Sequence, residues 1–245
     1  MAKAVAKKKK AKSSKKAAKG KLQPLRRLRR WLLRAALGAA AFFMFLVLLY
    51  SVVNPPITHT IWVEQRRLGE VDRMWVPLEE ISPVLARSVV AAEDAQFCRH
   101  WGFDARAIQA AIAAGGARGG STISQQVVKN VFLWQGRSWP RKVLETLLTP
   151  VVEIVWSKRR ILEVYLNVAE MDEGVFGAEA AARKYFGVGP DELSARQAAL
   201  IAAVLPNPKE RSARRPSNFL QRRATQIADG AATIRADGRA DCFED

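Results

Sequence analysis

The sequence predicts a mainly α-helical domain that one N-terminal helix holds at a membrane. Residues 35–53, AALGAAAFFMFLVLLYSVV, contain no charged side chain. At about 1.5 Å of rise per residue, a helix of this length nearly crosses the hydrocarbon core of a bilayer. Beyond residue 80, apolar residues recur at helical spacing in successive segments that begin after capping residues or end at glycine.

We interpret residues 35–53 as an uncleaved membrane anchor. A cleaved signal peptide is the alternative, but its apolar region would usually be about 7–15 residues long and a small-residue cleavage site would follow. Here Asn54 and two prolines follow instead. The lysines and arginines before the span predict a cytoplasmic N-terminus and a body on the outer side of the membrane.

The formal net charge of +17 suggests a nucleic-acid partner until its distribution is considered. Residues 1–34 hold fifteen of the 40 lysines and arginines and no acidic residue. The body at 35–245 therefore carries 25 basic against 23 acidic residues and is nearly neutral. Because a basic tail beside a membrane attracts anionic lipid, we expect membrane contact and no nucleic-acid binding.

The chain divides into four predicted parts: a basic cytoplasmic tail at 1–34, a transmembrane helix at 35–53, an extended linker at 54–75 and a helical domain at 76–245. The linker begins with a helix-breaking Asn-Pro-Pro and continues with mixed β-branched and polar residues. Helices are predicted over residues 84–94, 105–116, 123–134, 141–156, 157–168, 174–186, 195–205 and 216–228.

The two cysteines, Cys98 and Cys242, have two interpretations. They could pair in an oxidising compartment, or both could be free thiols, because two residues do not make a disulfide framework. The sequence offers no cluster of metal-ligating residues and no cysteine nucleophile beside a clear base.

The segment EDAQFCRHWGFD at 93–104, here called the first segment, follows an apolar helix. Glu93 lies at the predicted helix end, and Phe97, His100 and Trp101 gather at the chain reversal. A glutamate beside aromatic residues can acquire the raised pKa that acid–base catalysis near neutral pH requires. Acidic residues at a helix end can equally serve solubility alone.

The segment GGSTISQQVVKN at 119–130, here called the second segment, brings glycines and hydroxyl groups to a predicted helix start. Free N–H groups and the helix dipole favour an anion there. Gln126 and Lys129 follow three residues apart on one face. The pattern predicts phosphate binding; the alternative is a plain N-cap at Thr122 followed by a polar helix face.

Arg141 and Glu145 stand four residues apart and would share a helix face, whereas Lys142 would point away from it. Taken alone, Arg141 and Glu145 predict a surface ion pair that contributes about 0.3–0.5 kcal/mol.

The stretch VFLWQGRSWP at 131–140 is more apolar and aromatic than a soluble domain usually exposes. Its large side chains are Phe132, Leu133, Trp134, Arg137 and Trp139. We interpret it as part of a lobe that dips into the membrane; the alternative is that these residues pack under a loop.

Five segments together resemble the motifs of glycosyltransferase family 51, the bacterial peptidoglycan polymerases, in that family's order over residues 76–225. They are EDAQFCRHWGFD, GGSTISQQVVKN, RKVLE, SKRRILEVYLN and ARQAALIAAVLPNP. No SxxK, SxN and KTG signatures of a penicillin-binding transpeptidase follow these segments, so the sequence resembles the monofunctional members. Cys98 and the acidic end DCFED are less usual for the family.

The resemblance implies a lysozyme-like helical fold with a small membrane-proximal lobe, in the periplasm at the inner membrane. It implies that Glu93 is the general base for the 4-hydroxyl of the acceptor GlcNAc of lipid II. The oxygen would attack the anomeric carbon at the reducing end of the growing glycan strand, with inversion and release of undecaprenyl pyrophosphate. Phe97 and His100 would shape this site.

The resemblance also places Thr122, Gln126, Lys129, Arg141 and Glu145 around the donor. Lys129 and Arg141 would stabilise the charge of the leaving pyrophosphate, and Glu145, as a second catalytic carboxylate, would orient these cations or a water molecule. A divalent cation, Mg²⁺ or Mn²⁺, could assist at the pyrophosphate, although no carboxylate cluster fixes a metal site. Other cell-wall synthesis or division proteins could be further partners.

Two other functions fit parts of the pattern. A lysozyme-like or lytic glycan-cleaving enzyme would use a single glutamate as an acid that protonates a sugar oxygen. A pyrophosphate leaving group needs no such acid, and Lys129 and Arg141 have little use in glycan cleavage, so they favour synthesis. A non-catalytic cell-wall scaffold would keep the anchor and the helices without needing Glu93.

Overall fold

The computed structural model describes residues 2–113, 115, 119–136 and 138–244, with side chains described from residue 26 onward. The chain forms two compact units, Met1–Leu49 and Tyr50–Asp245. The first consists of one helix, α1 (Ala2–Tyr50). The second contains every other element and all of the predicted site residues.

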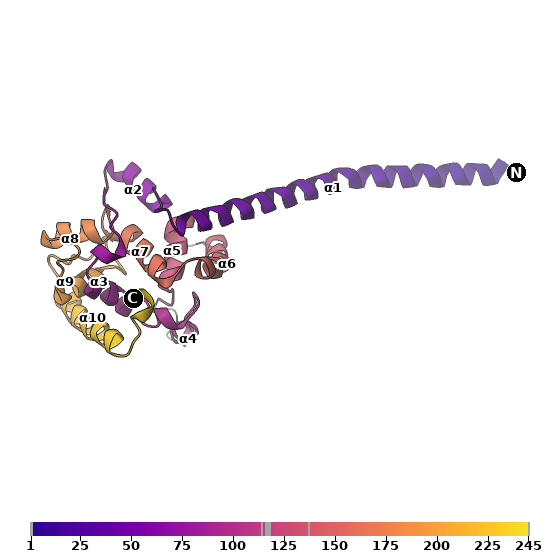
Figure 1. Ribbon diagram of the computed structural model, residues 1–245. Coiled ribbons are helices and arrows are strands. Elements are labelled where there is room, and N and C mark those ends of the chain that lie inside the picture. The colour runs from indigo at the N-terminus through magenta and orange to yellow at the C-terminus, as the bar shows by residue number, and fades with distance from the viewer. Residues whose placement is uncertain (1, 114, 116–118, 137, 245) are drawn as a thin grey trace. The chain divides into compact units, whose positions relative to one another are not determined.

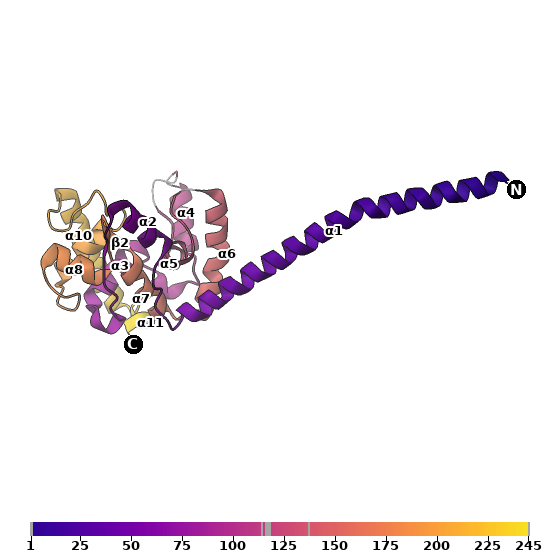
Figure 2. The same cartoon turned by 90° about the horizontal axis from the view of Figure 1, so that it is seen from above.

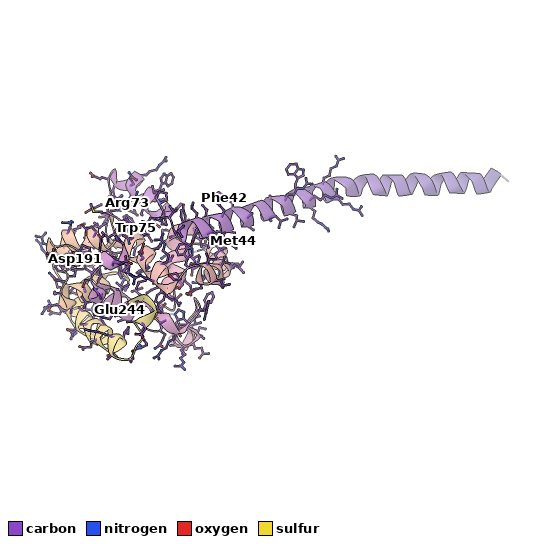
Figure 3. All side chains as sticks on the ribbon, viewed as in Figure 1. Phe42, Met44, Arg73, Trp75, Asp191 and Glu244 are labelled. Atoms are coloured by element: carbon purple, nitrogen blue, oxygen red, sulfur yellow. A yellow bond between two sulfur atoms is a disulfide. The ribbon has the colours of Figure 1, made fainter. Side chains whose placement is uncertain are left out.

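Helix α1 contains the predicted membrane span. Within the described part of the chain, Arg26–Tyr50 is the one helix long and apolar enough to cross a bilayer. Its apolar side chains project outward, as Phe42 and Met44 show with 62% and 40% of their surface exposed (Figure 3). Lipid removes the cost of exposing such side chains, so a single N-terminal membrane anchor accounts for this helix.

The second unit is mainly helical, which confirms the predicted fold class. Its longer helices are α2 (His59–Leu68), α3 (Pro83–Glu93), α4 (Ala105–Ala113), α5 (Ile123–Phe132), α6 (Trp139–Val155), α7 (Lys158–Val168), α8 (Ala178–Phe186), α9 (Ala195–Val204) and α10 (Asn218–Ala236). Short elements are the 3₁₀ helices η1 (Leu78–Glu80) and η2 (Phe97–Arg99), the single turn α11 (Asp241–Glu244), and strands β1 (Asp72–Arg73), β2 (Glu170–Asp172) and β3 (Val175–Phe176).

The prediction that residues 54–75 form an extended linker is wrong for its central part, because α2 lies there. The Thr58 hydroxyl caps this helix by accepting a hydrogen bond from the Ile61 N–H at 3.3 Å. Ile61 and Glu64 are buried on its inner face. Capping and burial therefore outweigh the β-branched composition on which the prediction depended, since intrinsic propensity is weak.

Two helix groups make up the helical body of this unit. Helices α3, α9 and α10 pack against one another on one side, and α5 packs against α6 and α7 on the other (Figures 1 and 2). Their contact faces are apolar, as the complete burial of Leu85, Val127 and Ile201 shows. The end of α3 and the start of α5, which carry the first and second segments, meet where the groups join.

A three-stranded sheet of order β1-β3-β2 joins the end of the linker to the turn after α7. Strand β1 pairs parallel to β3, and β2 pairs antiparallel to it. The side chain of Asn167 supports this sheet, because it accepts from the Val76 N–H and donates to the Val76 carbonyl, each at 2.9 Å.

Gly177, between β3 and α8, has a backbone that only glycine adopts easily, with φ 88° and ψ 167°. A Cβ there would lie 2.9 Å from the Asn167 carbonyl oxygen. Gly187, which ends α8 at φ 72° and ψ 20°, has open space around it. It therefore serves as a matched control for the cost of positive φ alone.

We predict that Gly177→Ala lowers the free energy of unfolding by about 3 kcal/mol and Gly187→Ala by about 1 kcal/mol. In thermal unfolding of the detergent-solubilised chain, each kcal/mol corresponds to a shift of about 2–4 °C. Equal melting temperatures for the two variants would show that the close approach to Asn167 carries no cost.

Candidate active site

Glu93 is the last residue of α3, and its half-buried carboxylate faces α5. Its Oε2 accepts a hydrogen bond from the Gln126 amide nitrogen at 2.8 Å. Burial raises the pKa of Glu93, while the hydrogen bond from Gln126 and the positive charges of Arg223 and Lys129 oppose the rise and the charge of Asp94 adds to it. The structure thus brings the candidate base to the helix that carries the candidate cation.

Tyr165, in α7, fixes the orientation of Gln126. Its hydroxyl donates to the Gln126 Oε1 at 3.2 Å, which leaves the amide nitrogen directed at Glu93. Burial raises the pKa of the Tyr165 phenol well above its usual value, so the hydroxyl keeps its proton. The sequence did not single out Tyr165, because an aromatic residue among apolar ones at helical spacing gives no sign of where its hydroxyl lies.

Asp94 joins the first and second segments, a role that the sequence interpretation missed. Its buried carboxylate accepts from the Ile123 N–H, at the start of α5, at 3.0 Å. Its other oxygen lies 2.8 Å from the His100 Nε2. A carboxylate at a helix N-terminus is favourable both as a hydrogen-bond acceptor and through the helix dipole.

The start of α5 is bonded to protein groups, contrary to the prediction of free N–H groups for a phosphate. The Ile123 N–H binds Asp94, and the Gln125 N–H binds the Thr122 hydroxyl at 3.3 Å. Thr122 is buried and its hydroxyl donates to the Gly102 carbonyl at 2.6 Å. The N-cap interpretation of Thr122 is therefore confirmed, and Lys129, farther along the helix, remains the candidate in α5 for binding an anion.

Lys129, one turn after Gln126, is half-buried. Among the described residues, no group forms a hydrogen bond or an ion pair with its ammonium group. Burial lowers its pKa, and the negative charge of Glu145 opposes this effect. Lys129, Gln126 and Tyr165 line a pocket with a volume of about 350 Å³, so an unpaired cation faces a cavity beside Glu93.

Glu145, in α6, is buried, so the expectation of a surface ion pair with Arg141 is wrong. It accepts from Arg141 at 2.7 Å, from Lys142 and from the Gln125 amide at 3.3 Å. Lys142 therefore points toward Glu145 and not away from it, because a residue three positions earlier on a helix also shares its face. Glu145 is thus an acceptor that fixes cations, and its surroundings do not suit a base.

Phe97 and His100 differ in how deeply they are buried. Phe97 is completely buried, and its ring centroid lies 6.4 Å from that of His100 in an edge-to-face arrangement. It therefore supports the loop from within the core, whereas the half-buried His100 lies nearer the surface. Lys158 donates to the His100 carbonyl and to Glu153, each at 2.8 Å, which holds the same loop against α6 and α7.

Part of the aromatic stretch at 131–140 packs inside the domain, and part of it is exposed as a membrane-contacting lobe requires. Phe132 packs against Trp156 with ring centroids 6.1 Å apart, and Leu133 is buried. Trp134 and Trp139 are exposed, with 38% and 84% of their surface accessible. Arg137 lies outside the described residues, as do residues 114 and 116–118, on which the end of the helix predicted at 105–116 depends.

Cys98 and Cys242 form a disulfide with their Cα atoms 5.6 Å apart, which settles the question that the sequence left open. Sequence spacing could not reveal it, because 144 residues separate the two cysteines. Among the described residues, no group of three or more His, Cys, Asp or Glu side chains could hold a metal ion.

Comparison with known proteins adds an independent observation. The family model described as Transglycosylase matches residues 62–231. A biosynthetic peptidoglycan transglycosylase of Jannaschia sp. is 63% identical over 88% of this chain and 90% of its own length. A protein of the same description from Stutzerimonas stutzeri is 49% identical over 82% of this chain and 88% of its own length. Another, from Caulobacter vibrioides, is 43% identical over 89% of this chain and 96% of its own length. The chain therefore belongs to the transglycosylase family as a peptidoglycan glycosyltransferase, as its five motifs predict.

Proposed function

We propose that the chain polymerises lipid II into linear β-1,4 glycan strands, with Glu93 as the general base. The observation that carries this proposal is the placement of a half-buried carboxylate of raised pKa beside an unpaired lysine, Lys129, on the facing helix. A base close to a cation that lines a cavity suits a reaction that needs a proton removed at one point and negative charge stabilised at another.

In the proposed reaction, Glu93 takes the proton from the 4-hydroxyl of the acceptor GlcNAc as the oxygen bonds to the donor anomeric carbon. The bond from that carbon to the pyrophosphate oxygen breaks, and its electron pair leaves with undecaprenyl pyrophosphate. Attack opposite the leaving group inverts the α-linkage to β. Pyrophosphate leaves as an anion, so the site needs no second acid, and Lys129 and Arg141 supply positive charge where negative charge develops.

Glu145 is proposed to act on the cations and not on the proton. Because Arg141, Lys142 and Gln125 all donate to it, its carboxylate is engaged by the protein before any substrate arrives. For the same reason it does not offer a metal ligand beside Lys129, and the residues there do not form a metal site. The proposed effect of Mg²⁺ or Mn²⁺ on the pyrophosphate therefore has no support from the donor set.

Glycan cleavage is the less favoured alternative. It would require Glu93 to act as an acid that protonates a sugar oxygen. The unpaired Lys129 has no role in that step, and the matched relatives are described as biosynthetic. A non-catalytic scaffold would not need a buried base and cation, since burying such groups without use lowers stability.

We propose that the N-terminus lies in the cytoplasm and the second unit on the outer face of the inner membrane. The basic residues of 1–34 precede the span, and the Cys98–Cys242 disulfide suits an oxidising compartment. Helix α6 exposes Trp139, Leu147 and Ile154, an apolar surface that could contact lipid near the undecaprenyl chain. Contacts with division or other cell-wall proteins remain a prediction.

We predict that Glu93→Gln abolishes polymerisation and leaves the fold intact. Because burial raises the pKa of Glu93, its ionised form costs folding stability at neutral pH, and a neutral glutamine removes this cost. The test is incubation of detergent-solubilised wild type and variant with labelled lipid II, together with thermal unfolding of each. We expect glycan strands only from the wild type and a variant melting temperature that is not lower. Polymerisation by Glu93→Gln at the wild-type rate would contradict the proposal, and release of fragments from preformed glycan by the wild type would favour cleavage.

We predict that Tyr165→Phe moves the acidic limb of the pH profile of kcat/KM to higher pH. Loss of the hydroxyl frees Gln126 to turn, and the hydrogen bond that lowers the pKa of Glu93 weakens. Charged hydrogen bonds contribute about 1.5–3 kcal/mol and one pH unit corresponds to 1.36 kcal/mol, so losing about half of this bond's contribution predicts a shift of roughly 0.5–1 unit.

The matched control is Tyr185→Phe, which also removes a buried tyrosine hydroxyl, here one that donates to the Met171 carbonyl at 2.9 Å. It should lower the melting temperature without moving the pH profile. Equal profiles for Tyr165→Phe and the wild type would show that Tyr165 only packs.

A further inference from the structure

Residues 237–244, here called the C-terminal strap, lie beyond the matched family region, which ends at residue 231. The strap holds the loop of the first segment at three points. Cys242 is bonded to Cys98, Arg239 donates to the Ala95 carbonyl at 3.0 Å, and the Phe243 ring lies 6.4 Å from that of Phe97. An element outside the family module is therefore fastened to the loop that follows the candidate base.

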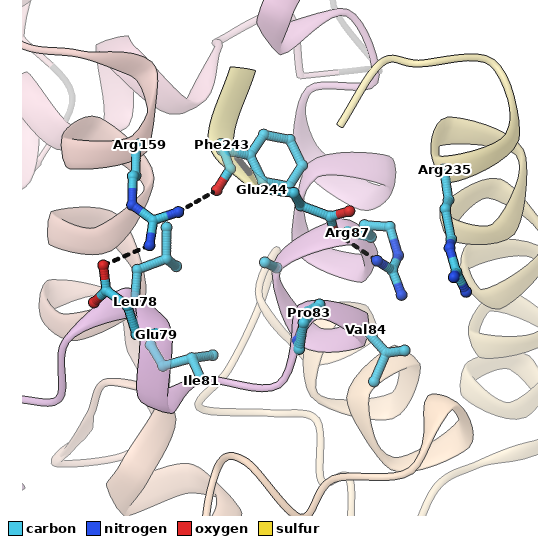
Figure 4. A pocket seen from close by; sticks show the side chains of 11 residues that line it. Leu78, Glu79, Ile81, Pro83, Val84, Arg87, Arg159, Arg235, Phe243 and Glu244 are labelled. Atoms are coloured by element: carbon cyan, nitrogen blue, oxygen red, sulfur yellow. Dashed lines mark hydrogen bonds and ion pairs between the residues drawn. The ribbon is translucent and has the colours of Figure 1, made fainter. Parts of the chain in front are cut away.

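On its other side the strap is held by two arginines (Figure 4). Arg87 donates to the Glu244 carboxylate at 2.6 Å, and Arg159 donates to the Phe243 carbonyl at 3.0 Å. Between these two anchors lies a pocket of about 470 Å³, so the protein beneath the strap is not tightly filled. Helix α11, a single turn, is too short to persist without such contacts. The disulfide is therefore the one covalent link that keeps the strap in place.

The loop transmits the position of the strap to the site through a short series of contacts. Phe97 supports the ring of His100, and the His100 Nε2 bonds Asp94 at 2.8 Å. The other ring nitrogen, Nδ1, has no hydrogen-bonding partner among the described residues, so the ring depends on Asp94 and on packing. Asp94 in turn binds the N–H of Ile123, where the helix that carries Lys129 begins.

We propose that the C-terminal strap is a redox-dependent positioning element, and that the enzyme reaches its full polymerisation rate only when Cys98 and Cys242 are joined. The proposal rests on the proposed role of Glu93, whose loop the strap holds. It implies a partner protein, a thiol oxidase that carries a reactive disulfide.

In the proposed oxidation, the thiolate of Cys98 or Cys242 attacks the oxidase disulfide, forms a mixed disulfide and releases one oxidase thiolate. The second cysteine loses its proton and attacks the sulfur of the first, and the second oxidase sulfur leaves as a thiolate. Two electrons pass to the oxidase, which ends as a dithiol, while Cys98 and Cys242 form their disulfide.

The test compares the full chain in detergent in its oxidised form, after reduction with a phosphine and alkylation, and as the Cys98→Ser, Cys242→Ser double variant. The chain has only these two cysteines, so reduction and alkylation report on this bond alone. We expect kcat on lipid II to fall about tenfold in both altered forms with KM changed less than twofold, because a small displacement of catalytic groups lowers the rate more than binding. Unalkylated reduced enzyme should recover its rate when a disulfide oxidase reoxidises it.

Phe243→Ala, with the disulfide intact, separates packing from the covalent link, and Phe219→Ala, at an exposed phenylalanine, is its control. We expect a reduced kcat for the former and an unchanged one for the latter. The proposal is overturned if kcat of the folded, reduced protein and of the double variant stays within twofold of the oxidised enzyme, or falls only at temperatures where these forms unfold. Glycan synthesis by the oxidised wild type tests the proposed function separately.

Discussion

The site depends on one buried carboxylate, that of Asp94, which bonds two segments from opposite sides of the domain. It follows Glu93 directly in the chain, and it accepts from the N–H of Ile123 at the start of the helix that carries Lys129. A buried carboxylate without partners would cost several kcal/mol, so Asp94 is stable only when the helix start and His100 are in place. The same bond therefore fixes the distance between the candidate base and the candidate cation.

The cations of the candidate site differ in whether a carboxylate pairs with them, and this difference suits the proposed transfer reaction. Glu145 pairs with both Arg141 and Lys142, which holds the two cations beside it on α6 and leaves one net positive charge. Lys129 has no such partner among the described residues, and burial disfavours both its charge and that of Glu93. A bound pyrophosphate would stabilise the charge of Lys129, and a proton taken from the acceptor would neutralise Glu93. Both changes therefore favour the progress of the reaction.

Much of the fold followed from the sequence, because helix periodicity, capping residues and an uncharged apolar run are local signals. The helix α2 did not, since its formation depends on burial against other elements. The ordered motifs located Glu93 and Lys129, but the contacts of Asp94 and Tyr165 could not be predicted. Both side chains act on atoms distant in sequence, and an aspartate after a glutamate or a tyrosine among apolar residues gives no local sign of such a role.

The pairing of Cys98 with Cys242 shows the same limit, because a disulfide is decided by which chain ends meet in space. Here the disulfide places the C-terminal strap against the loop that follows the candidate base. The domain thus combines a family scaffold, which carries the candidate base and cations, with a strap that constrains the loop after the candidate base.

The most direct test of the central role of Asp94 is kcat on lipid II for Asp94→Asn. Asparagine keeps the shape and one acceptor oxygen but loses the charge that holds both Ile123 and His100. We predict that kcat falls by about 100-fold while the protein stays folded, because the candidate base and the helix of the candidate cation lose their common attachment. A kcat within twofold of the wild type would contradict it.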